Sequence, residues 1–167
     1  MVVVYLSIHL LFAAVPFILR TRREIRAFIL TLVAVIAIAG VGFVLLPAEL
    51  AFPPPGDLGT WQALFRLADW LNLDYNLVPS LHVALSVACL AAFASRAGLV
   101  GAALLWTWAG AIAASTLLTH QHHLLDVATG AALGLGANRL IYRQLVSASR
   151  ASATSPGARG GPSPARP

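Results

Sequence analysis

Long apolar stretches alternate with short polar connections along the chain. The apolar stretches cover about residues 2–19, 28–46, 78–95, 99–118 and 124–142. Each is close to the roughly 20 residues that a helix needs to cross the hydrocarbon core of a membrane. The pattern predicts an all-α fold, a polytopic membrane bundle of about five transmembrane helices.

One more helix is expected inside the long connection 47–77. The run FPPPG at 52–56 cannot continue a helix, because proline lacks an amide hydrogen and its ring clashes with the preceding turn. Thr60 can then cap the stretch TWQALFRLADWL, whose apolar and polar residues fall on opposite faces. This pattern favours a short helix lying in the membrane interface, and a lid helix packed on the bundle fits it equally well. Both arrangements place Arg66 near the outer rim.

The composition is that of a membrane protein. Hydrophobic residues make up 59% of the 167 residues and charged residues only 10%, with a mean hydropathy of +0.81. Soluble domains average about 45–50% apolar and about 25% charged residues. The length allows one folded bundle, which we expect over residues 1–147. Residues 148–167 are rich in Ser, Ala, Pro, Gly and Arg and lack periodic apolar positions, so a disordered tail is expected there.

The placement of the arginines predicts how the bundle is oriented. They gather in the connection 20–26, at Arg96, and from Arg139 to the end of the chain. All these positions fall on one side of a five-span bundle, and the positive-inside rule makes that side cytoplasmic. The connections 47–77 and 119–123 then face outward from a plasma or inner membrane, and the C-terminus is cytoplasmic. The net charge of +5 reflects these arginines, and few aromatic residues lie among them, so the expected partners are membrane lipids and not nucleic acid.

The sequence VPSLHV at 78–83 opens the third apolar stretch with a polar cluster. Ser80 is a natural N-cap, and the amides that follow it, beginning with Leu81, would point toward the outer surface, where they could bind an anion. His82 falls in the first turn, near the positive end of the helix dipole. The alternative, which the pattern favours equally, is that Ser80 only caps the helix and His82 bonds a neighbour.

A second polar cluster, THQHHLLDV at 119–127, opens the last apolar stretch. His122 and Asp126 are four residues apart and would share one face of the fifth helix, so the carboxylate can hold one imidazole nitrogen and leave the other free. His122 is therefore a candidate nucleophile. His123, three residues from Asp126, competes for this role, whereas His120 fits a simple interfacial histidine.

The remaining candidates are assigned a structural role, or no metal or disulfide site is predicted for them. Imidazole and carboxylate groups suit zinc, but the spacing HQHH is too tight for three rings to bind one ion from a regular helix, so no metal and no cofactor is predicted. The single cysteine, Cys89, has no intrachain partner for a disulfide. Gly130 and Gly134, four residues apart, are interpreted as a surface for close helix packing.

The two polar clusters also carry a family resemblance. PSLH at 79–82 and STLLTHQHHLLDVATG at 115–130 resemble the second and third signature motifs of the type 2 phosphatidic acid phosphatase superfamily. The resemblance covers about residues 76–130. PSLH, together with threonine after the serine of the third motif, is most similar to the branch that includes inositol phosphorylceramide synthases and their bacterial relatives.

The resemblance implies a metal-independent phosphoryl transfer in two steps. His122 would attack phosphorus to form a phosphohistidine, His82 would protonate the departing alcohol oxygen, and Asp126 would orient His122. Water as the acceptor gives a lipid phosphatase that cleaves phosphate monoesters or diesters of lipids, which is the function we expect. The alternatives are a phosphotransferase that moves a phosphoryl-headgroup between lipids, and a lipid-binding relative without catalysis.

The chain departs from the family pattern in the groups that hold phosphate. Thr116 stands where the third motif has an arginine, and the stretch LPAELAFPPP at 46–55 lacks the basic residue of a first motif. This shortage motivates the non-catalytic alternative, because phosphoryl transfer depends on neutralising charge on the phosphate oxygens. The residues expected to bind phosphate are Ser80, Leu81, Ser115, Thr116 and Arg66.

Overall fold

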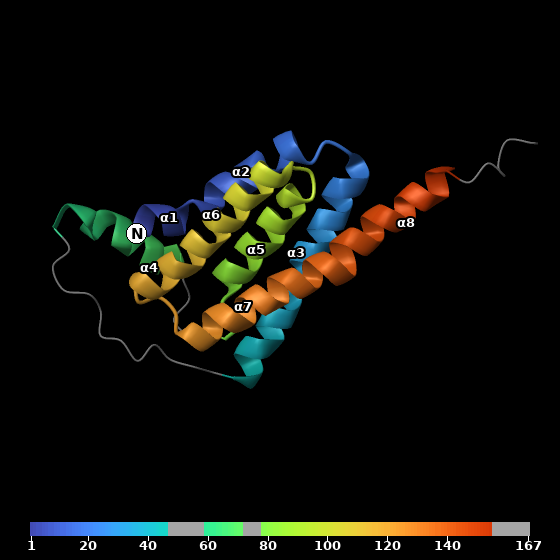
Figure 1. The fold of residues 1–167 in the computed structure, drawn as a ribbon. Helices are drawn as coiled ribbons and strands as arrows, with labels where there is room; N and C mark the ends of the chain where they lie inside the picture. The colour runs from blue at the N-terminus through green and yellow to red at the C-terminus, as the bar shows by residue number, and fades with distance from the viewer. Residues whose placement is uncertain (47–58, 72–77, 155–167) are drawn as a thin grey trace, which may run out of the picture.

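The structure is a computed structural model that describes residues 1–46, 59–71 and 78–154 (Figure 1). The described residues are helical and form no strand, which confirms the all-α prediction. The elements are α1 (Val2–Leu6), α2 (Ile8–Ile18), α3 (Arg22–Leu45), the 3-10 turn η1 (Gly59–Trp61), α4 (Gln62–Leu71), α5 (Leu81–Ala94), α6 (Leu99–Leu118), α7 (Leu124–Ala137), the π-helical turn η2 (Asn138–Tyr142) and α8 (Arg143–Thr154).

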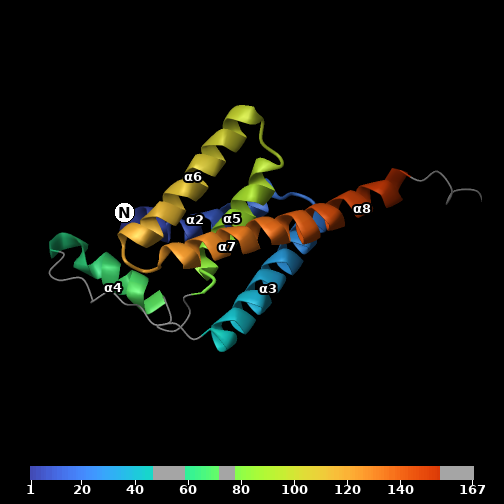
Figure 2. The same cartoon turned by 60° about the horizontal axis from the view of Figure 1, so that its bottom comes forward.

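Helix α5 is the centre of the bundle. Its residues from Ser86 to Phe93 are all buried, and it packs against α2, α3, α6 and α7 (Figure 1 and Figure 2). Fourteen residues give a helix of about 21 Å, which is shorter than the roughly 30 Å hydrocarbon core of a bilayer. Because neighbouring helices surround α5, its apolar side chains are buried against them. Packing in the core of the bundle therefore explains why this stretch is apolar.

Two described helices, α3 and α6, are long and apolar enough to cross a membrane. Their most apolar windows have mean hydropathies of 2.8 and 1.5, and only 22% of each window is buried. Large apolar side chains that they expose include Ile29, Val33, Ile36, Leu99 and Leu104. The other predicted spans coincide with helices that are shorter, broken or interrupted by a π-helical turn, so the five-span arrangement stays a prediction.

The first apolar stretch forms two helices instead of the single one predicted, with a break at Ser7. The Ser7 hydroxyl donates to the carbonyl of Val4 at 2.5 Å, and the Ser7 amide donates to the same carbonyl at 3.2 Å. Serine side chains compete with the backbone for its hydrogen bonds in this way. This competition explains the break, which the pattern of apolar positions does not predict.

The arginine-rich connections come together at one end of the bundle. Thr21 and Glu24 form a capping box at the start of α3, and Arg96, which follows α5, makes an ion pair with the buried Glu24. Val146 of α8 lines the same cavity as Thr21 and Glu24. The structure therefore brings together the charges of the connection 20–26 and Arg96, which the positive-inside argument assigned to one side. Which side of a membrane this is stays a prediction.

At the opposite end, α5 and α7 approach each other unusually closely. The amide of Ser80 donates to the carbonyl of Asp126 at 2.9 Å, so the two chains are hydrogen-bonded backbone to backbone where the helices begin. A Cβ atom on Gly130 would collide with the Ser80 carbonyl, and one on Gly134 would lie 2.5 Å from the Ala84 carbonyl oxygen. These distances confirm the packing role assigned to the two glycines, because only hydrogen fits between the helices there.

The short helix expected in the connection 47–77 is present as η1 and α4. Thr60 lies inside the 3-10 turn and does not precede the helix as its cap, and Gly59 has a φ of 53°. Leu64 packs against Val2 and Tyr5 of α1, whereas Trp61 and Arg66 are exposed. A position of α4 in the membrane interface stays a prediction, and the rest of the connection lies outside the described residues.

The last helix is longer than expected. Helices α7 and α8 are joined through η2 into one continuous rod, in which α7 packs against α5 and the α8 end extends beyond the other helices (Figure 2). The rod ends at Thr154, inside the segment 148–167 for which a disordered tail was predicted. Residues 155–167 lie outside the described residues, and the disordered tail at 148–167 stays a prediction.

The close approach of α5 and α7 predicts opposite effects for two glycines of α7. Gly134→Ala is expected to lower the free energy of unfolding by about 1–3 kcal/mol, because the added methyl group meets backbone that cannot move aside. Gly136→Ala is the matched control: a Cβ there meets nothing within 4 Å, so stability should rise by up to about 1 kcal/mol. Thermal unfolding in detergent, followed by far-ultraviolet circular dichroism, measures both. Equal stability of the two variants would contradict the packing described here.

Candidate active site

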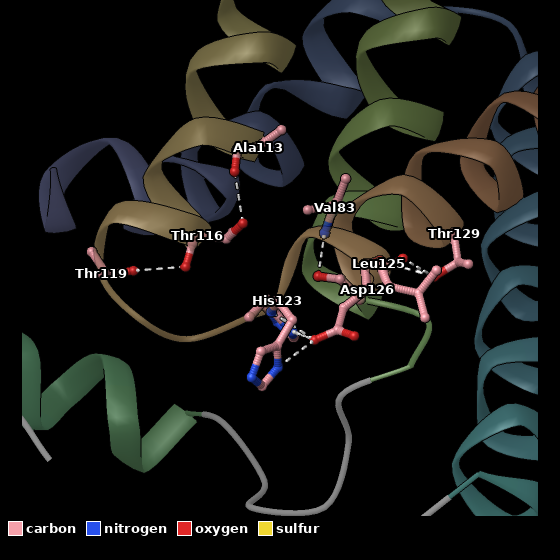
Figure 3. A network of polar contacts seen from close by, with 10 residues as sticks. Val83, Ala113, Thr116, Thr119, His123, Leu125, Asp126 and Thr129 are labelled. Atoms are coloured by element: carbon pink, nitrogen blue, oxygen red, sulfur yellow. Dashed lines mark hydrogen bonds and ion pairs between the residues drawn. The ribbon is translucent and has the colours of Figure 1, made fainter. Parts of the chain in front are cut away.

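Helix ends surround the candidate site. Helix α5 begins at Leu81, α7 begins at Leu124, and α6 ends at Leu118, one short connection before α7 (Figure 3). Ser80 is fully buried, and its hydroxyl oxygen accepts the Val83 amide at 3.4 Å, which confirms it as the N-cap of α5. The first backbone bond of the helix runs from the Ala84 amide to the Ser80 carbonyl, so the amides of Leu81 and His82 precede the hydrogen-bonded turn.

His82 is held by the first helix of the chain. Its Nε2 donates to the carbonyl of Tyr5 at 2.8 Å, and its ring is stacked on the Tyr5 ring with centroids 3.9 Å apart and planes 12° from parallel. Because a carbonyl can only accept, Nε2 carries the hydrogen of this bond. His82 is also within electrostatic range of His122. The structure thus shows the neighbour bond that one sequence interpretation expected, and places the ring near the second histidine.

His122 and Asp126 are brought together, although not in the way the sequence predicted. The prediction that both lie on one face of a helix is wrong, because α7 begins only at Leu124 and His122 precedes it. Asp126 is the third residue of that helix, and its Oδ2 accepts the amide of the N-cap residue His123 at 2.8 Å, which caps the start of the helix. His122 Nδ1 nevertheless lies 3.6 Å from the same oxygen. This is an ion-pair distance and longer than a hydrogen bond, and Nδ1 has no other partner among the described residues.

The same carboxylate also faces His123. Figure 3 shows the His123 ring and the Asp126 carboxylate pointing toward each other, with Nδ1 3.5 Å from Oδ2. The two rings differ in burial: the side chain of His122 is 6% exposed and that of His123 is 36% exposed. Both histidines therefore lie at a similar distance from the carboxylate, and they differ in how deeply they are buried.

Burial sets the protonation of His122. It lowers the pKa of His122 below the usual value, because a charged imidazolium loses its hydration, while the nearby Asp126 carboxylate partly opposes this shift. The imidazole is therefore neutral at neutral pH. A neutral ring with a carboxylate behind Nδ1 has a lone pair available on Nε2, which is the state that a nucleophile requires.

The hydroxyl groups predicted to bind phosphate are buried at the end of α6. Ser115 donates to the Ile112 carbonyl and Thr116 to the Ala113 carbonyl, each at 2.7 Å. Their hydrogens thus point along their own helix, and each hydroxyl would have to rotate to donate to a ligand. Thr116 also anchors the connection to α7, because its carbonyl accepts the Gln121 amide at 3.1 Å.

Arg66 is linked to these residues indirectly, through α1. It is exposed on α4, which packs on α1, and α1 in turn carries the Tyr5 that contacts His82. Sequence reasoning missed Tyr5 altogether, because an aromatic residue inside an apolar stretch gives no signal of a polar contact. No group of three or more His, Cys, Asp or Glu side chains in the described ranges is arranged to hold a metal ion.

Comparison with known proteins identifies the family. The profile described as the PAP2 superfamily matches residues 52–150, which is more than half of the chain and spans every predicted site residue. The chain belongs to the PAP2 superfamily. Members of this superfamily are typically phosphatases, so a phosphoesterase-type activity is indicated. No curated protein and no solved structure matches the chain, and the resemblance to the branch of inositol phosphorylceramide synthases stays a prediction.

The lowered pKa of His122 predicts how stability depends on pH. The unfolded histidine takes up a proton near pH 6.5, whereas the folded one does so only at lower pH. Between these values the unfolded state binds more protons, so the unfolding temperature should fall as the pH drops below about 6.5. In His122→Gln the group no longer titrates, and the fall should be smaller. Thermal unfolding scans of both proteins at matched pH values measure the difference, and identical pH profiles would contradict the assignment.

Proposed function

We propose that this PAP2 superfamily protein is an integral membrane lipid phosphatase that works through a phosphohistidine on His122. The observation that supports it most is the buried His122 ring with Nδ1 3.6 Å from Asp126, at the end of the bundle where Ser80 and His82 begin α5. A buried neutral imidazole backed by a carboxylate has the features of an activated nucleophile. All of these residues lie inside the family match.

The proposed reaction has two steps. Nε2 of His122 attacks phosphorus, the bond from phosphorus to the lipid oxygen breaks, and a His82 ring protonated on both nitrogens gives its Nδ1 proton to the departing oxygen. Asp126 stabilises the positive charge that forms on the His122 ring. In the second step His82 takes a proton from water as the water attacks phosphorus, the bond from phosphorus to Nε2 breaks, and inorganic phosphate leaves.

Charge on the phosphate oxygens would be met mainly by the start of α5. The amides of Leu81 and His82 precede the first backbone bond of the helix and lie at the positive end of its dipole. Arg66 of α4 would supply a positive side chain from the outer helix, and the hydroxyls of Ser115 and Thr116 would add donors after rotation. This assignment replaces the missing arginine of the third motif with backbone groups.

A location in the membrane is supported by two features of the fold. Helices α3 and α6 expose most of their apolar windows, which lipid can cover. The arginine-rich end with Arg96 and the start of α5 lie at opposite ends of a 14-residue helix, about 21 Å apart. By the positive-inside rule the site then faces the extracytoplasmic side, and a phosphorylated lipid would reach it from the outer leaflet.

The proposal predicts that His122→Ala abolishes turnover. With radiolabelled phosphatidic acid in detergent micelles, the rate of phosphate release should fall by about three orders of magnitude or more, because the covalent step is lost. A brief reaction stopped in alkali, in which phosphohistidine survives, should leave label on the wild-type protein and none on the variant.

His123→Ala is the matched control for this experiment, because it removes the other ring that faces Asp126. It should keep both the label and most of the turnover. Label that vanishes in His123→Ala and persists in His122→Ala would show that the nucleophile has been misassigned. Label that appears in a new lipid, with no free phosphate released, would favour the phosphotransferase alternative.

A further inference from the structure

We propose that Tyr5 is a positioning residue for the proton donor of the reaction, and that it fixes the His82 ring so that Nδ1 delivers the proton. The inference rests on the proposed function. Tyr5 lies outside residues 52–150, so the family match assigns it nothing. It reaches His82 across 77 residues of sequence. Both residues are held in place: Tyr5 is 1% exposed, and His82 lies in the first turn of the central helix α5.

Two contacts with Tyr5 fix different motions of the His82 ring. The stacked geometry, with planes 12° from parallel, sets the plane of the imidazole. The 2.8 Å bond from Nε2 to the Tyr5 carbonyl then sets its rotation within that plane and the position of the hydrogen. As the acid, His82 carries hydrogen on both ring nitrogens, and once the Nδ1 proton has passed to the departing oxygen the neutral ring keeps its hydrogen on Nε2 and a lone pair on Nδ1. Because Nε2 is occupied by the carbonyl, Nδ1 is the nitrogen left to exchange a proton with a substrate.

The carbonyl that holds His82 lies in the last turn of the first helix. Helix α1 ends at Leu6, and the backbone hydrogen bonds change at Ser7, whose amide donates to the carbonyl of Val4 and whose carbonyl accepts the amides of Leu10 and Leu11. The Tyr5 carbonyl accepts the His82 ring nitrogen from this position.

Helix α4 also helps to hold Tyr5 in place against His82. Tyr5 and Val2 form a small buried cluster with Leu6 and with Leu64 of α4. The cluster holds α1 between α4 and α6, so Tyr5 cannot move away from His82 without opening it. This arrangement matters because a proton donor displaced by about 1 Å can lose two orders of magnitude in rate.

Leaving-group dependence distinguishes a positioning role from a merely structural one. A lipid alkoxide needs a proton as it departs, whereas p-nitrophenolate leaves readily without one, so a fault in the acid affects only the first substrate. For Tyr5→Leu we expect kcat on phosphatidic acid to fall by about 10- to 100-fold and kcat on p-nitrophenyl phosphate by no more than about threefold. Tyr5→Phe keeps the ring and the carbonyl, so its kcat on phosphatidic acid should fall less than that of Tyr5→Leu. Val3→Ala, an exposed neighbour, is the control for α1.

A double-mutant cycle tests whether Tyr5 acts through His82. In a His82→Gln background, Tyr5→Leu should cost no further rate on phosphatidic acid, because the group that it positions is gone. Equal losses on the two substrates, or losses that multiply in the double variant, would overturn the inference. Failure of the proposed function looks different: wild type would then turn over neither substrate, or His122→Ala would remain active.

A measurement on the unaltered protein covers the case in which Tyr5→Leu does not fold. Nitrogen NMR of the full chain, labelled at histidine and assigned with His82→Gln, reports which ring nitrogen carries hydrogen. We expect neutral His82 to carry it on Nε2, as the bond to the Tyr5 carbonyl requires. Hydrogen on Nδ1 would overturn the inference, since the proposed orientation then cannot hold.

Discussion

A single backbone hydrogen bond, from the amide of Ser80 to the carbonyl of Asp126, determines where the site forms. It joins the starts of α5 and α7, and two glycines of α7 allow it because a side chain at either position would collide with the backbone of α5. The N-cap of one helix is thereby placed beside the third residue of the other. Every proposed catalytic group lies within a few residues of this junction. The packing of α5 on α7 sets the positions of His82 and Asp126, and His122 lies in the short connection that leads into α7.

Asp126 makes two interactions from its place at the start of α7. Its carboxylate accepts the His123 amide, which caps the start of α7, and it faces the His122 ring. His122 lies before the helix, its ring is buried, and burial lowers its pKa so that the ring is neutral. In the proposed mechanism the amides at the start of α5 meet the phosphate charge in place of the missing arginine.

Features that depend on neighbouring residues could be predicted from the sequence. The cap at Ser80, the apolar helices, the short outer helix and the packing glycines all follow from local patterns, and PSLH with the histidine cluster pointed to the family. The features that were not predicted depend on competition for hydrogen bonds or on contacts between residues far apart in the sequence. The break at Ser7 and the start of α7 at Leu124 arise where side chains compete with the backbone for hydrogen bonds. The contact of Tyr5 with His82 joins two apolar stretches far apart in sequence, and no periodicity encodes such a pairing.

The central claim is that His82 and His122 act on one phosphorus atom at the junction of α5 and α7. An experimental structure of the protein with orthovanadate, which mimics the phosphorus of a transferring phosphoryl group, tests it most directly. We predict vanadium bonded to Nε2 of His122, with Asp126 behind Nδ1 and an oxygen of vanadate within hydrogen-bond distance of the His82 ring. Vanadium bonded to His123, or vanadate bound beyond the reach of His82, would contradict the account.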